Sequence, residues 1–530
     1  MRRSTTRAAR AGRSAALAGL ALVAGLSVLS PSASSATDGH GTNAGAAPGR
    51  ARAVAAHEAL DHARAALAGT PPAQEPTQAP APGAVDPTMA LRDLFVARQD
   101  LSGPARLTAN RILARPTSPN DPNGDSYRAP SHKTCGPHVC VHWVSRTVDA
   151  PPSRAWVTVT LNTMEAVWKR EVGGLGYRKP ASDGTRGGNA KLDVYLKDVG
   201  DQGFYGYCTT ERQVTGHPRF ASGYCVLDDD FARSQFGAVP RNSLKVTAAH
   251  EFFHAIQFNY DYREDPWFME ATATWMEEQV YDGINDNRQY LPAGQVRHPE
   301  TPLDTFDQYG SEQYGNWPFF EFLSSRWGRG IVRTAWYDAS GVPGAPNEYS
   351  IDAVTSVLAS HGGLPAVYAD FAGANTRPAE AYQEGAAWPT ATIAKTSTLT
   401  PSAPTQSSTQ LVDHLSAKNV RAIPGGALSA ADWKLTVTVD APGAATSPAV
   451  LVTIDRTGSR STLTQRVALD DTGAGTVEVP FSPAQVAKVT VSLANASTRY
   501  TCHDYTDYSC QGTPTDDDKP FVATLTAHRP

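Results

Sequence analysis

The feature that most constrains the fold is the stretch TAAHEFFHAIQFNYD at residues 247–261. Apolar residues lie on nearly every side of the helix that this stretch would form, so the spacing predicts a buried helix over 242–259. His250 and His254 are four residues apart and therefore lie one turn apart on one face. Two buried imidazoles need polar partners, which are either a metal ion or hydrogen-bonding groups of a packed core.

The spacing of the two histidines suits a metal. Both imidazoles can reach one ion about 2.1 Å away. Glu251 lies about 100° round the helix, from where its carboxylate reaches a water molecule on the ion rather than the ion itself. The pattern H-E-x-x-H therefore predicts His250 and His254 as zinc ligands and Glu251 as the general base. The alternative is a helix whose histidines are satisfied by hydrogen bonds, since this short pattern also arises by chance.

A third ligand is expected because catalytic zinc sites take three protein ligands and keep a fourth position open. Glu270, in DPWFMEATATWMEEQVYD (265–282), follows His254 by 16 residues and lies near the start of a second expected helix. The intervening residues can turn the chain and bring this helix back along the first. Thr274 and Glu277 follow on the face of Glu270 and are expected to support the ligands. The rival third ligands are Asp261, Glu264, Asp265 and Glu277.

With HEFFH followed by WFMEATATWMEE, the chain resembles the gluzincin group of zinc metallopeptidases, and most closely uncharacterised secreted bacterial metalloproteases. The resemblance spans about 135–375, and its specific part is 246–282. It implies that His250, His254 and Glu270 bind Zn²⁺ and that Glu251 is the catalytic glutamate. It also implies an oxyanion donor after the third ligand, for which Tyr314 is the first candidate and Tyr309 and Tyr290 are others.

The chain departs from parts of that group. The gap between the second histidine and Glu270 is shorter than in thermolysin-like enzymes, and no Gly-x-Met-x-Asn element for binding a free N-terminus precedes the helix. We therefore expect a zinc-dependent endopeptidase with a protein or peptide substrate. The alternatives are a secreted zinc aminopeptidase, or a non-catalytic surface or carbohydrate-binding protein with a vestigial zinc site. The segment GYCVLDDDF (223–231) is a candidate strand for pairing with an extended substrate.

The N-terminus predicts export. Residues 1–36 combine five arginines, an apolar run and a small-residue cleavage site, as in a secretory signal peptide. Without them Lys plus Arg falls from 47 to 42 while Asp plus Glu stays at 52, so the net charge changes from −5 to −10. An acidic chain is not expected to bind nucleic acid or anionic lipid. We expect a secreted, extracellular protein with no membrane association after signal removal.

The rest of the chain divides by composition. Residues 37–134 form an Ala/Pro-rich region with short helices, either a removable pro-segment or a linker. Residues 135–395 are expected to form a zincin-like metallopeptidase domain, with a mixed sheet and active-site helix followed by a helical subdomain. A Ser/Thr/Pro linker is expected at 396–410, and short alternating segments predict a small all-β sandwich at 411–530. The predicted fold class is therefore α+β.

The six cysteines fall as near neighbours, which favours local disulfides in an exported chain, namely Cys135–Cys140, Cys208–Cys225 and Cys502–Cys510. A rival interpretation is a metal held by Cys135, His138, Cys140 and His142. Oxygen-rich segments raise two weaker expectations of a structural Ca²⁺. One is formed by Asp121, Asn123 and Asp125, and the other by Asp228, Asp229 and Asp230.

Overall fold

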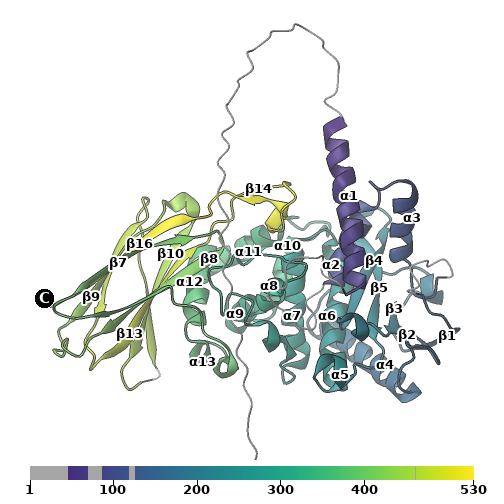
Figure 1. Cartoon of the computed structure of the whole chain (residues 1–530), viewed down its shortest axis with the longest axis horizontal. Coiled ribbons are helices and arrows are strands. Elements are labelled where there is room, and N and C mark those ends of the chain that lie inside the picture. The colour runs from purple at the N-terminus through teal and green to yellow at the C-terminus, as the bar shows by residue number, and fades with distance from the viewer. Residues whose placement is uncertain (1–45, 70–85, 119–125, 460) are drawn as a thin grey trace, which may run out of the picture. The chain divides into compact units, whose positions relative to one another are not determined.

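The computed structural model describes residues 46–69, 86–118, 126–459 and 461–530. The predicted signal peptide at 1–36 therefore lies outside the described residues. The elements discussed below belong to one compact unit, Arg50–Pro530. This unit is a mixed α+β structure, as the sequence predicted (Figure 1). Within the described ranges, no helix has the length and apolar character needed to span a membrane.

The first half is built on a five-stranded mixed sheet with the order β1-β2-β3-β5-β4. Its strands are β1 (Ser131–Cys135), β2 (Val139–Val144), β3 (Leu192–Lys197), β4 (Gly206–Val214) and β5 (His217–Asp228). β2, β3 and β5 are parallel, whereas β1 and β4 are antiparallel strands at the two edges. The strand expected at 223–231 is β5, but it pairs with β3 and β4 and therefore has no free edge. The expectation that it takes up substrate by edge addition is wrong, because the sheet edge on this side is β4.

One long helix covers β4 and β5, and a second long helix packs on it. The helix expected over 242–259 is confirmed as α6 (Pro240–Asp261), which packs on β4 and β5 and against α4 (Arg154–Trp168). α6 is buried almost throughout, as its apolar circumference predicted. The chain then turns within four residues, and Pro266 begins α7 (Pro266–Tyr281) at a position where its missing N–H costs nothing. α7 packs back along α6.

Residues 86–118 are part of this core rather than a linker. α2 (Pro87–Ala97) packs beside β4, and Arg92 donates hydrogen bonds to the backbone oxygens of Tyr262 and Glu264. α3 (Gly103–Ile112) leads to Arg115, whose guanidinium is nearly buried. It pairs with three buried carboxylates, namely Asp183, Asp193 and Glu211. Residues 86–118 are therefore packed into the core and do not form an extended linker, and Arg115 supplies a cation to three carboxylates of this core. Removal of residues upstream of 86 stays a prediction.

A helical subdomain follows α7, as expected. The helices that pack on one another and on α7 are α8 (Glu312–Gly315), α9 (Trp317–Trp327), α10 (Gly330–Asp338), α11 (Ser350–Leu358) and α12 (Leu364–Asn375). Two further short helices are α5 (Arg233–Phe236) and α13 (Pro378–Ala381). Large aromatic side chains of α9 and α12 lie in the same core as the residues of α6 and α7.

The C-terminal part is a β-sandwich of two sheets with the orders β11-β10-β13-β8-β6 and β12-β9-β16-β7. The strands are β6 (Lys395–Leu399), β7 (Thr405–Val412), β8 (Ser416–Pro424), β9 (Lys434–Asp440), β10 (Pro448–Arg456), β11 (Thr462–Arg466), β12 (Ala474–Pro480), β13 (Val486–Asn495) and β16 (Lys519–His528). One apolar core joins the two sheets.

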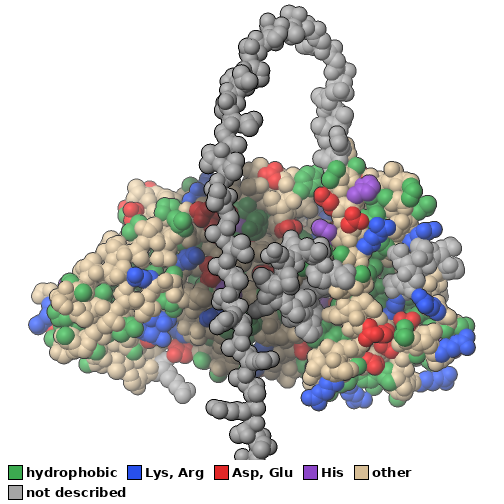
Figure 2. Space-filling view, in the orientation of Figure 1, with side chains coloured by type: hydrophobic (Ala, Val, Ile, Leu, Met, Phe, Trp, Pro, Cys, Tyr) green, Lys and Arg blue, Asp and Glu red, His purple; other side chains and the backbone are tan. Residues whose placement is uncertain are grey.

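The expected linker at 396–410 is wrong, because β6 and β7 occupy it. The Ser, Thr and Gln side chains that suggested a linker alternate between exposed and half-buried positions along the edge strand β7. In Figure 2 the surface of the β-sandwich is mostly tan, the colour of the backbone and of uncharged polar side chains.

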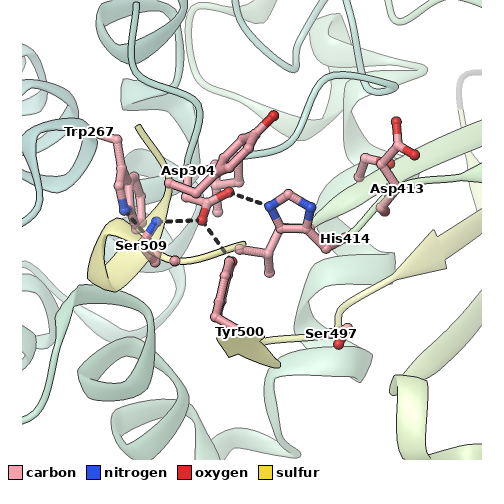
Figure 3. A network of polar contacts seen from close by, with 12 residues as sticks. Trp267, Asp304, Asp413, His414, Ser497, Tyr500 and Ser509 are labelled. Carbon is pink, nitrogen blue, oxygen red and sulfur yellow. Dashed lines mark hydrogen bonds and ion pairs between the residues drawn. The ribbon is translucent and has the colours of Figure 1, made fainter. Parts of the chain in front are cut away.

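The sandwich is joined to the helical subdomain by packing and by a buried polar network. β10 and β13 lie against α12, where Gly373 allows close approach, since a Cβ there would lie 2.5 Å from Leu451. In the network of Figure 3, Asp304 accepts hydrogen bonds from the His414 ring (3.0 Å) and the Tyr500 hydroxyl (2.7 Å). It also accepts one from the backbone N–H of Ser509 (3.0 Å).

The three predicted disulfides are confirmed as Cys135–Cys140, Cys208–Cys225 and Cys502–Cys510. The first closes the β1–β2 hairpin and the second joins facing positions of β4 and β5. The metal site considered for Cys135, His138, Cys140 and His142 is therefore wrong, because its two thiols are bonded to each other. The three disulfides fit an oxidising, extracellular environment.

Candidate metal centre

Three side chains from α6 and α7 converge at one point. Nε2 of His250 lies 3.0 Å from Oε2 of Glu270, and Nε2 of His254 lies 3.2 Å from Oε1 of the same carboxylate. His254 and Glu270 are almost completely buried, and His250 is 9% exposed. One atom from each residue lies within 4.8 Å of the other two, so the group can hold a metal ion. The structure thus brings together the three ligands predicted from the sequence.

The outer nitrogen of each imidazole is held by a fixed acceptor. Nδ1 of His250 donates to Oε1 of Glu277 (2.9 Å), and Nδ1 of His254 donates to Oε1 of Gln257 (2.7 Å). The amide nitrogen of Gln257 in turn donates to the Met269 carbonyl (2.9 Å), which fixes its orientation. With the proton on Nδ1, a neutral imidazole directs the lone pair of Nε2 at Glu270. Both rings are therefore set in the tautomer that a metal ligand requires.

This arrangement is incomplete without a cation. His254 Nε2 and Glu270 Oε1 are buried and have no hydrogen-bond partner in the part of the chain that the structure describes. Two lone pairs that face each other in a dry site repel, and a proton or a metal ion between them removes the repulsion. When His254 and His250 carry a proton on Nε2 instead of a metal ion, their charges outweigh the effect of burial and hold the pKa of Glu270 well below its usual range. The two nitrogens and the carboxylate fit a divalent cation.

Glu251 faces the same space from the neighbouring position on α6. Burial raises the pKa of Glu251, and the charges of His254 and His250 offset part of that rise. Its Oε2 accepts a hydrogen bond of 3.3 Å from the hydroxyl of Thr88, at the start of α2. The cavity there has a volume of about 50 Å³, enough for a few water molecules. Its lining includes Asp86, Thr88, Tyr205, His250, Glu251, Glu270, Glu277, Tyr290 and Tyr314.

Two of the three tyrosines proposed as oxyanion donors lie at this cavity. The Tyr314 ring is 6.0 Å from the His250 ring and 5.0 Å from the Tyr290 ring, measured between centroids. Both tyrosines line the cavity, and burial raises the pKa of each phenol well above its usual value, so both keep their protons. Tyr309 does not line the cavity and contacts His62 instead.

The rival third ligands have other partners. Asp261 pairs with Arg219, while Glu264 accepts hydrogen bonds from the backbone N–H groups of Asp265 and Ser350. Asp265 accepts from the Ser350 hydroxyl and from the backbone N–H of Cys510. Glu277 contacts His250 as a supporting residue, whereas Thr274 donates to the backbone oxygen of Glu270 and does not touch its carboxylate.

Sequence reasoning missed Gln257, Asp86 and Thr88. Gln257 lies three residues after His254 on the same helix, a spacing that could have identified it. Nothing in the sequence links α2 to this site, because Thr88 and Glu251 are 163 positions apart. Burial and the charge of Glu270 raise the pKa of Asp86 well above its usual value, and Oδ2 of this side chain has no partner among the described residues.

A scan against protein-family models and a search of curated proteins return no match for the chain.

Proposed function

We propose that this chain is an exported zinc-dependent endopeptidase of the gluzincin type. The observation that carries the proposal is the convergence of His250 Nε2, His254 Nε2 and the Glu270 carboxylate at one buried point, with Glu251 beside them. Two imidazoles and one carboxylate with an open position are a donor set of catalytic zinc sites. Three disulfides and the signal-like N-terminus support export.

The architecture supports a zincin-like domain. A mixed sheet with an antiparallel edge strand, β4, lies beside the helix that carries H-E-x-x-H. The next helix, α7, returns along α6 and presents Glu270 to both histidines. A helical subdomain then completes the core. The order sheet, motif helix, third-ligand helix and helical subdomain is the one that the resemblance implies.

The chemistry follows from the positions of the side chains. A zinc ion held by His250, His254 and Glu270 would activate a water molecule and polarise the scissile carbonyl. Glu251 accepts the proton of the attacking water and passes it to the leaving amine. Tyr314 and Tyr290 line the cavity and keep their phenolic protons. Their hydroxyls are therefore the candidate donors to the negative charge that develops on the carbonyl oxygen.

Access of a peptide requires a movement. A cavity of about 50 Å³ does not admit a peptide chain, and Asp86 and Thr88 form one of its walls. Thr88 also accepts a hydrogen bond from the backbone N–H of Cys208 (3.2 Å) on the edge strand β4. The first turn of α2 therefore lies in the space where an extended substrate would pair with β4, and it has to move before cleavage.

The test is zinc content and casein cleavage measured on the same preparations of residues 37–530. Wild type should hold one zinc per chain and cleave casein. Glu270→Ala should lose zinc, whereas Glu251→Gln should keep it and lose at least a hundredfold in cleavage rate. Glu278→Gln, on the same helix but outside the site, should behave as wild type. A folded wild type without zinc, or an active Glu251→Gln, would overturn the proposal.

A further inference from the structure

One more carboxylate lies at the proposed metal centre, on a segment far from it in the sequence. Asp86 lines the same cavity as His250, Glu251 and Glu270 and is only 1% exposed. Its Oδ2 is buried and has no hydrogen-bond donor among the described residues. Glu270 Oε1 and His254 Nε2 are in the same condition. Three polar atoms around one centre are therefore buried without a partner.

The start of α2 holds Asp86 by its other groups. Oδ1 accepts the N–H of Met89 (2.9 Å) as the N-cap of the helix, and the backbone N–H of Asp86 donates to the Gln308 carbonyl (3.3 Å). Capping uses one carboxylate oxygen and leaves the other free. The carboxyls of Asp86 and Glu270 lie close enough to share a hydrogen bond. The capping residue of α2 thus faces a predicted metal ligand of α7.

Two buried carboxylates at this separation repel each other unless a proton or a cation lies between them. None of the described residues that line the cavity is a lysine or an arginine, so no side chain supplies that cation. A single shared proton would satisfy the two carboxyls but leave His254 Nε2 without a partner. A divalent ion at His250, His254 and Glu270 would satisfy all of these atoms together.

We propose that Asp86 is a fourth protein ligand, which closes the metal centre and keeps this form of the protein inactive. The inference rests on the proposed function. Catalytic zinc sites keep one position open, whereas sites filled by four protein ligands are structural. Asp86 is outside the three-residue group whose atoms lie within 4.8 Å of one another, so its carboxylate has to move toward the ion when the ion binds.

The same turn of α2 reaches the proposed general base, because Thr88 donates to Glu251. Asp86 and Thr88 are two residues apart, so one movement of this turn would free the open position of the metal and the general base together. The contact thus makes α2 an internal inhibitor that competes with the substrate carbonyl for the same position.

The acidic groups expected to hold Ca²⁺ differ from Asp86. One oxygen each of Asp198, Asp228 and Asp229 lies within 4.8 Å of the other two. Both oxygens of Asp228 accept backbone N–H groups, however, so this carboxylate is satisfied without an ion and Ca²⁺ binding there stays a prediction. The other expected group lies outside the described residues and consists of Asp121, Asn123 and Asp125.

The experiment compares wild type, Asp86→Asn and Asp86→Ser in residues 37–530, loaded with Zn²⁺ or with Co²⁺ as a spectroscopic probe. Asn and Ser both keep an oxygen that can cap α2, so the helix should still form. Asp470→Asn is the matched control, since Asp470 also accepts backbone N–H groups but lies in the β-sandwich. Zinc affinity is measured by competition with a chelator. Access to the open position is measured from the change in Co²⁺ absorption on adding imidazole, a neutral ligand that the loss of the Asp86 charge does not attract.

Both Asp86 variants should bind Zn²⁺ at least about tenfold more weakly than wild type, because the loss of a partner one contact further from a metal already costs about 10–100-fold. Both should bind imidazole about tenfold more tightly, since in wild type the open form is a minority of the population. Asp470→Asn should behave as wild type. Equal imidazole affinity in wild type and both variants, with zinc bound, would overturn the inference and leave the proposed function intact. A folded wild type without zinc would overturn both.

Discussion

The hydroxyl of Thr88 donates a hydrogen bond of 3.3 Å to Oε2 of Glu251. The backbone N–H of Cys208, on the edge strand β4, donates to the same hydroxyl. The first turn of α2 is thus hydrogen-bonded both to Glu251, the proposed general base, and to β4, the strand beside which a peptide would lie. In this form of the protein, the residues proposed for catalysis are assembled but closed to a large substrate.

Loosening this contact should increase activity. A hydrogen bond to a carboxylate contributes about 1.5 kcal/mol or more, so Thr88→Val should raise the rate of casein cleavage by about tenfold while zinc content stays the same. Asp86→Ala should act in the same direction, because it removes a buried side chain from the cavity wall. Thr108→Val is the control, since that hydroxyl bonds only within α3. If both variants lose activity with zinc retained, the turn belongs to the catalytic apparatus.

Gln257 should matter for metal affinity without touching the metal. Gln257→Met keeps the size of the side chain but removes the acceptor for His254 Nδ1–H, so the ring is no longer held in one tautomer. We expect zinc affinity to fall by about 10–100-fold, measured by competition with a chelator. Gln279→Met on α7 is the matched control, because Gln279 bonds to Glu321 and Arg329 instead. Equal affinities in the two variants would argue against this role for Gln257.

The junction with the β-sandwich should weaken at alkaline pH. Burial lowers the pKa of His414, but Asp304 and Asp517 outweigh it and raise this pKa to about 9. A group whose pKa is raised on folding stabilises the fold fully below its unfolded value, near 6.5, and loses that effect as the pH rises through 9. The contribution is about 3 kcal/mol. Thermal unfolding of wild type and Asp304→Asn, compared from pH 6.5 to 10, should show a stability difference that shrinks with pH; a constant difference would contradict the charged pair.

The β-sandwich should be required for the rest of the protein to fold. Asp265 accepts the backbone N–H of Cys510, and Trp267 donates to the Ser509 hydroxyl, so the start of α7 is completed by residues far along the chain. A chain ending at residue 394 would bury Asp265 and Asp304 with these partners missing. We expect little soluble protein and no cooperative unfolding by circular dichroism. A stable, zinc-binding fragment of this length would show instead that the sandwich is an independent accessory domain.

The mature protein should begin upstream of α2. Arg115→Met removes a cation shared by three buried carboxylates, of which only Glu211 keeps an arginine partner among the described residues, Arg186, and should cost about 3–5 kcal/mol, measured by denaturant unfolding. Arg111→Met, on the exposed side of α3, should change stability by less than 0.5 kcal/mol. N-terminal sequencing of secreted protein should locate any processing site before residue 86. A mature N-terminus beyond residue 115 would contradict the structural role of Arg115.

Sequence patterns predicted the helices and strands whose formation depends on residues close together in the chain. The spacing of apolar residues predicted α6, and the Ser102-Gly103-Pro104 break separated α2 from α3. A strand-like composition between turn residues predicted β2, β9 and β13, most of whose side chains are buried. It failed at β7, because the edge of a surface sheet needs only small polar side chains and these also compose linkers.

The sequence by itself determined that His250 and His254 share one face of a helix with Glu251 beside them, since an α-helix places residues four apart on one side whatever surrounds it. The sequence favoured Glu270 over the other candidate third ligands. It could not show that the Glu270 carboxylate lies beside the two histidines, because that depends on how α7 returns along α6. Only the tertiary structure brought Thr88 to Glu251, Asp198 to Asp229 and Asp304 to His414. These contacts join residues far apart in the chain, and long-range packing fixes them without leaving any local pattern.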